Sequence, residues 1–140
     1  SRAFANRQRF GQALAGFPAA SGQAGDGYVE VLAALKADGA SAPLVLIDPP
    51  FEQVDEMERC AQSLSEAISR MRQAVVAIWY PIKDQRQLKR FYQDLQGTGA
   101  PKLLRVELLV HAADNADVGL NGSGLAIANP PWGLEDELRS

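Results

Sequence analysis

Cysteine is almost missing from this sequence, and long apolar runs are missing altogether. Cys60 is the only cysteine among the 140 residues, so no disulfide can form within the chain. A reducing compartment is the default for such a chain, and we expect a cytoplasmic protein. No apolar run approaches the roughly 20 residues that a membrane-spanning helix needs, which predicts no membrane partner.

Positive charge and histidine are also scarce. The chain has 14 Lys and Arg against 17 Asp and Glu, a net charge of −3, which argues against a general nucleic-acid coat. An enzyme with a local basic patch remains possible, and the cluster from Lys83 to Arg90 is the densest candidate, although a solvated helix face is the simpler interpretation. His111 has no second His or Cys nearby, so we expect no metal site.

What is present fits one globular domain with a single core. Apolar spacing predicts helices and short apolar runs predict strands, separated by proline and glycine. The predicted helices cover about 10–17, 28–36, 55–72 and 88–95. The predicted strands cover 43–47, 74–80, 102–112 and 125–129.

The order of these elements predicts an α/β fold. The strands at 43–47 and 74–80 are continuously apolar, as buried parallel strands are, and Pro49 and Pro81 should end them. The last two strands have no helix between them, and the turn-rich segment 114–124 should join them as an antiparallel hairpin. We therefore expect a mostly parallel sheet with one antiparallel edge strand.

Asp48-Pro49-Pro50-Phe51 is the strongest chemical motif. It follows a buried strand and precedes a helix, where open α/β sheets bind ligands. The amino nitrogen of adenine is a poor nucleophile because its lone pair is delocalised into the ring. The Asp48 carboxylate and the Pro49 carbonyl could accept its two N–H bonds and free that lone pair for methylation. The ring of Phe51 could stack on the base, with Pro50 beside it; the alternative is a turn that caps the next helix.

Asn129-Pro130-Pro131-Trp132 repeats the pattern of two prolines followed by an aromatic residue. It follows a hairpin strand instead of preceding a helix, so we do not expect it to be the catalytic copy. Asn129 and Trp132 are secondary candidates for binding substrate in the same cleft.

Four motifs together resemble one family. They are Leu46 to Glu52, Ile78 to Pro81, Gly122-Ser123-Gly124 and Asn129 to Trp132, in order and with similar spacing from about Gly25 to Glu137. This arrangement resembles the bacterial 23S ribosomal RNA adenine-N6 methyltransferases, which have also been described as acting in catabolism of external DNA.

The resemblance implies a Rossmann-like class I methyltransferase fold that uses S-adenosylmethionine as cofactor and 23S ribosomal RNA as partner. It implies that Asp48 is catalytic and lies against the cofactor. By the same resemblance, Asp26-Gly27 contacts the adenine of the cofactor.

The sequence also departs from the family. A glycine-rich loop after a first strand should hold the cofactor, but the glycine-rich run 119–124 leads into a strand and is better explained as a turn. An acidic residue after a second strand and an N-terminal segment with His and Lys are not found either. We therefore expect residues 1–140 to be the C-terminal part of one methyltransferase domain, without the half that carries the cofactor loop.

Two other functions stay open. The same tetrapeptide occurs in DNA adenine-N6 and glutamine-amide methyltransferases. A non-catalytic remnant could instead bind partners, or associate with itself, through a sheet edge that the missing strands would cover.

These departures predict weak cofactor binding by the 140 residues alone, since much of the expected site is missing. Calorimetry with S-adenosylmethionine should give a dissociation constant well above the micromolar range. Micromolar affinity would contradict the prediction.

Overall fold

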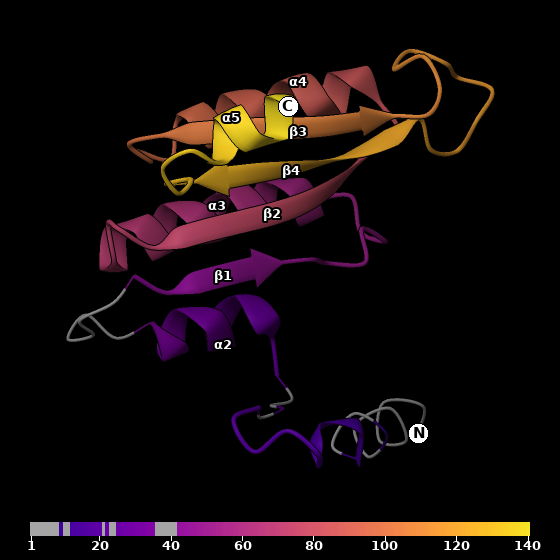
Figure 1. Cartoon of the computed structure of the whole chain (residues 1–140). Coiled ribbons are helices and arrows are strands. Elements are labelled where there is room, and N and C mark those ends of the chain that lie inside the picture. The colour runs from indigo at the N-terminus through magenta and orange to yellow at the C-terminus, as the bar shows by residue number, and fades with distance from the viewer. Residues whose placement is uncertain (1–8, 10–11, 21, 23–24, 36–41) are drawn as a thin grey trace.

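The computed structural model describes residue 9, residues 12–20, residue 22, residues 25–35 and residues 42–140. Residues 12–14 are helical and end in a turn, as predicted, while Phe10 lies outside the described residues. The later elements form a sheet with helices packed on it (Figure 1). They are α2 (Gly27–Ala34), β1 (Leu44–Ile47), α3 (Glu56–Arg70), β2 (Val75–Ile82), α4 (Gln85–Gln96), β3 (Leu103–Leu109), β4 (Gly122–Ala128) and α5 (Leu134–Arg139).

The four strands lie in the order β1-β2-β4-β3. β1 and β2 are parallel, and β4 is antiparallel to both of its neighbours. The α/β class and the hairpin are confirmed, but the prediction of an antiparallel edge strand is wrong, because β4 is interior and β3 forms the edge. The small and apolar residues of β4 suit a strand paired on both sides, whereas β3 carries Arg105 and Glu107.

β2 does not end before Pro81, contrary to the prediction. The N–H of Val75 donates to Pro43 O on the β1 side, and N–H groups alternate sides along a strand, so residue 81 also faces β1. β1 has already ended there, because its last residue, Ile47, pairs with Ile78. Pro81 lacks an N–H, but no β1 acceptor lies opposite it, so no hydrogen bond is lost. On its other side Pro81 pairs with Ser123 of β4. β4 likewise starts earlier than predicted, at Gly122.

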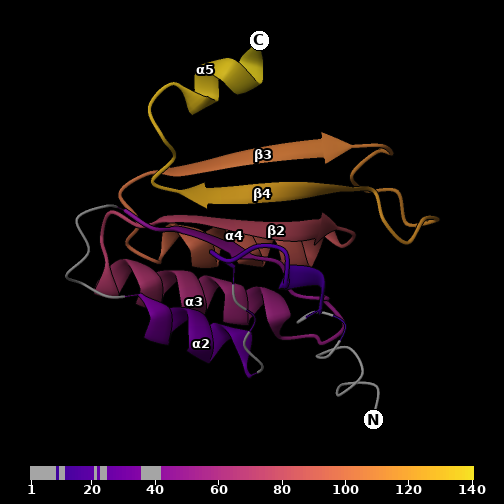
Figure 2. The ribbon, with the colours of Figure 1, turned by 60° about the horizontal axis from the view of Figure 1, so that its bottom comes forward.

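The helices α2, α3 and α4 all pack on one face of the sheet (Figure 2). Cys60 and Leu64 face the sheet from α3, and Leu88 and Phe91 do so from α4. They meet strand residues such as Ile78, which is fully buried. Each such side chain contributes roughly 1.5–3 kcal/mol of burial free energy, so this layer holds the fold together.

The opposite face of the sheet is apolar and largely open. Leu44, Leu46 and Leu108 are 75%, 65% and 70% exposed. Among the described helices only α5 lies on that side, near β3, and it buries no residue (Figures 1 and 2). No helix in the described part of the chain is long and apolar enough to span a membrane.

Gly124 leaves room for a buried tyrosine. A Cβ at position 124 would lie 2.4 Å from Tyr80 Cζ, far inside contact distance. The Tyr80 hydroxyl donates to Glu107 Oε1 at 2.7 Å, and Tyr92 donates to the same oxygen. This cluster ties β2 to β3 and α4 across β4, and burial raises the pKa of Tyr80.

Gly124→Ala should therefore lower the free energy of unfolding by about 1–3 kcal/mol, the usual cost of overpacking a core. Gly119→Ala is the matched control, since a Cβ there meets nothing within 4 Å, and it should change stability by less than about 0.5 kcal/mol. Urea unfolding of the two variants measures the difference; equal stabilities would contradict the role given to Gly124.

Candidate ligand-binding site at the end of β1

A cavity of about 360 Å³ opens at the carboxyl end of β1, between α2 and α3. Strand β1 and the residues after it contribute Leu46 to Pro50, and α3 contributes Glu56 and Arg59. The start of α2 contributes Asp26, Gly27, Tyr28 and Val31. Asp26, Gly27, Asp48, Pro49 and Pro50, which the sequence singled out, thus line one cavity.

Asp48 lies directly after β1 and is exposed. Among the described residues it forms no ion pair and accepts no side-chain hydrogen bond, so both carboxylate oxygens are available to a ligand. The φ angles of Pro49 and Pro50 are fixed by their rings, which limits the directions that the neighbouring carbonyls can take. A carboxylate and a rigid backbone carbonyl therefore lie side by side along the chain.

Phe51 follows in a left-handed conformation, with φ of 52°. This conformation is rare for an aromatic residue and costs about 1–3 kcal/mol. Its ring rests against Trp79 of β2, with centroids 5.8 Å apart and planes at 57°. Phe51 does not line the main cavity but a neighbouring one of about 190 Å³, which also includes Met57, Pro81 and Lys83.

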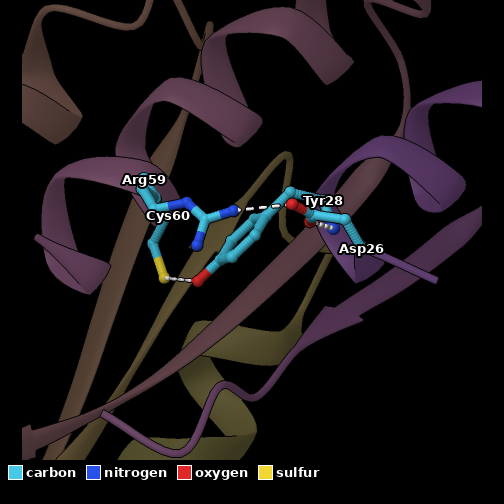
Figure 3. A network of polar contacts seen from close by, with 4 residues as sticks. All are labelled: Asp26, Tyr28, Arg59 and Cys60. Carbon is cyan, nitrogen blue, oxygen red and sulfur yellow. Dashed lines mark hydrogen bonds and ion pairs between the residues drawn. The ribbon is translucent and has the colours of Figure 1, made fainter. Parts of the chain in front are cut away.

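A polar network fixes the start of α2 against α3 (Figure 3). Asp26 caps α2, because its Oδ1 accepts from the Tyr28 N–H at 3.0 Å, a bond that contributes about 1 kcal/mol. Its Oδ2 accepts from Arg59 Nη2 at 2.9 Å. The Arg59 guanidinium also lies over the Tyr28 ring, 4.4 Å from its centroid. Both oxygens of Asp26 retain further lone pairs for a ligand.

The same network reaches the core through the Tyr28 hydroxyl, which lies 3.6 Å from Cys60 Sγ. Burial raises the pKa of the Cys60 thiol from 9.0 to about 11. Burial, helped by the contact with Cys60, also raises the pKa of Tyr28. Both groups therefore stay protonated near neutral pH, and we assign neither of them a role as nucleophile or base.

The charges in the cavity favour a ligand that is cationic or rich in hydrogen-bond donors. Three carboxylates, those of Asp26, Asp48 and Glu56, line it against one guanidinium, that of Arg59. Within the described residues, no group of three or more His, Cys, Asp or Glu could hold a metal ion.

The second proline motif lies at the other end of the sheet. β4 runs antiparallel to β2, so its last residues pair with the beginning of β2, as Ala128 does with Val76. The Asn129 amide donates to the carbonyl oxygens of Arg72 and Ala74, at 2.7 and 2.9 Å, and Trp132 is fully exposed. The expectation that Asn129 and Trp132 share a cleft with Asp48 is therefore corrected.

Sequence reasoning did not place three polar residues that the structure brings to the cavity: Tyr28, Glu56 and Arg59. The i, i+3 spacing of Glu56 and Arg59 puts both on one side of α3, which was the only available signal. It is a weak one, because such charged pairs are common on exposed helix faces.

The known proteins that this chain resembles in sequence are described as ribosomal RNA methyltransferases. Residues 10–140 match the model of a family described as ribosomal RNA large subunit methyltransferase D, RlmJ. Two relatives named ribosomal RNA large subunit methyltransferase J, from Haemophilus influenzae and Escherichia coli K12, are 38% identical over 96 residues and 36% identical over 97. Each alignment covers 69% of this chain and 34% of the relative, so the matched part is about one third of those proteins.

A crystal structure of a protein from Legionella pneumophila strain Philadelphia 1 has the same fold. The TM-score is 0.71 at 24% identity, over 82% of this chain and 42% of the other.

The raised pKa of Cys60 predicts a loss of stability in alkali. The folded state holds the thiol proton more tightly than the unfolded state, so this contribution is complete below pH 9 and is lost as the pH rises toward 11. The free energy of unfolding should fall in that window, by at most about 1.4 kcal/mol per pH unit for this one proton. Urea unfolding from pH 8 to 11 should show a shallower fall for Cys60→Ala; identical slopes would contradict the assignment.

Proposed function

Because the chain belongs to the ribosomal RNA large subunit methyltransferase D, RlmJ, family, we propose that the protein methylates the N6 amine of an adenine in 23S ribosomal RNA. The observation that carries the proposal is the position of Asp48 and Pro49 in an acidic cavity that also contains Asp26-Gly27. The proposal concerns the whole protein, since the relatives are about three times as long as the matched segment.

The residues of the cavity suit S-adenosylmethionine. The cofactor supplies an electrophilic methyl group on a positively charged sulfonium. An excess of carboxylates stabilises a cation, and Asp26 keeps lone pairs that can accept from the amine of an adenine. Gly27 presents no side chain, so the backbone at the start of α2 can approach a flat ring closely.

Asp48 and Pro49 act on the target amine. The Asp48 carboxylate and the Pro49 carbonyl each accept one N–H of the adenine, which turns the nitrogen lone pair toward the methyl group. When bound, the cofactor would supply its methyl group to that lone pair and would leave as a neutral thioether. The nitrogen then loses one proton to water. No covalent bond to the protein forms.

Phe51 and Lys83 mark the side from which the substrate arrives. They line the cavity next to the main one, so a base turned out of its stack can lie on the Phe51 ring with a phosphate near Lys83. The names of the two relatives favour RNA over the DNA and glutamine substrates that the tetrapeptide alone leaves open.

Asp48→Ala in the full-length protein should lower the rate of methyl transfer to unmethylated ribosomal RNA at least 100-fold, because the amine loses its charged acceptor. The assay follows incorporation of a labelled methyl group into RNA. Asp55→Ala is the control. Asp55 is exposed and makes no side-chain capping bond, so the activity of this variant should stay near that of the wild type.

Wild-type activity in Asp48→Ala would contradict the assignment. Methylation of DNA or of a glutamine peptide, with ribosomal RNA left unmodified, would favour one of the rival substrates.

A further inference from the structure

Glu56 contains an oxygen atom that the protein does not satisfy. The residue is the first of α3 and only 6% exposed. Its Oε2 is buried and has no hydrogen-bond partner among the described residues. A buried carboxyl oxygen without a partner is costly and uncommon in folded proteins, so its presence calls for an explanation.

The protein groups around Glu56 do not explain why its Oε2 is buried without a partner. Arg59, one turn further along α3, pairs with Asp26. The favourable position of an acidic residue at a helix start explains its charge but not its burial, because Glu58 occupies the same turn and is exposed.

Glu56 instead faces the cavity at the end of β1, which it lines together with Asp26 and Gly27. On the α2 side, the same cavity is lined by Tyr28, whose pKa the negative charge of Glu56 helps to raise. That side is where we propose that the nucleoside of the cofactor binds.

We propose that Glu56 binds the cofactor directly: its carboxylate turns into the cavity, where Oε2 accepts a hydrogen bond from an N–H or O–H of the adenosyl group. The assignment rests on the proposed function, and it gives the site a carboxylate in addition to Asp26 and Asp48. A buried polar group that lacks a partner in the protein alone can find that partner in a ligand.

Calorimetry on the full-length protein tests this assignment with S-adenosylmethionine and S-adenosylhomocysteine, which share the adenosyl group. Glu56→Gln keeps the size of the side chain but removes the charge that strengthens the bond, and should weaken both ligands about tenfold. Asp55→Asn is the matched control, since it removes a neighbouring exposed carboxylate, and should leave both affinities unchanged.

Thermal unfolding without ligand separates binding from structure. If Glu56 serves the ligand, Glu56→Gln should melt at the same temperature as the wild type or higher, and the ligand should raise that temperature less. A less stable variant with normal affinities would overturn the proposal in favour of a structural role.

Three further outcomes would also decide the matter. Unchanged affinities in Glu56→Gln, with a wild type that binds both ligands, would overturn the Glu56 assignment alone. Weaker binding of S-adenosylmethionine but not of S-adenosylhomocysteine would overturn the hydrogen bond in favour of a distant effect on the sulfonium. A wild type that binds neither ligand would overturn the proposed function as well.

Discussion

The four-residue parallel pairing of β1 with β2 fixes the position of the candidate site. β1 touches no other strand in the described residues, and its register, from Leu44 opposite Val75 to Ile47 opposite Ile78, decides where Asp48 emerges. A slip by one residue would exchange the buried Val45 and Ile47 for the exposed leucines of the strand, so burial under the helices holds the register. The chemistry at Asp48 thus depends on a short strand that is held by pairing with one neighbour and by packing on one face.

The start of α2, which forms the other side of the cavity, is held by side-chain contacts and not by strand pairing. Asp26 both caps α2 and pairs with Arg59 of α3, and Tyr28 lies between the guanidinium and the Cys60 thiol. An exposed ion pair alone contributes little. Here the pair is combined with a helix cap and an aromatic contact, so the start of α2 is held by several weak interactions that share the same residues.

Patterns of neighbouring residues in the sequence predicted the individual helices and strands. The spacing of Cys60, Leu64 and Ile68 identified α3, and the apolar run before Asp48 identified β1. The position of β4 inside the sheet could not be predicted, because strand order depends on partners distant in sequence. The continuation of β2 through Pro81 depends on where β1 ends, which is also a property of the pair. The motif Asp48-Pro49-Pro50 was found from its neighbours, whereas the burial of Glu56, a polar residue at the border of an apolar stripe, emerges only in three dimensions.

The open sheet face has a consequence for the behaviour of these residues in solution. With Leu44, Leu46 and Leu108 in water on one side, the molecule has a surface that hydrates poorly. Salts such as ammonium sulfate strengthen the attraction between surfaces of this kind. A preparation of these residues alone should therefore salt out early and be retained strongly on phenyl resins, and purification is best carried out at low sulfate concentration.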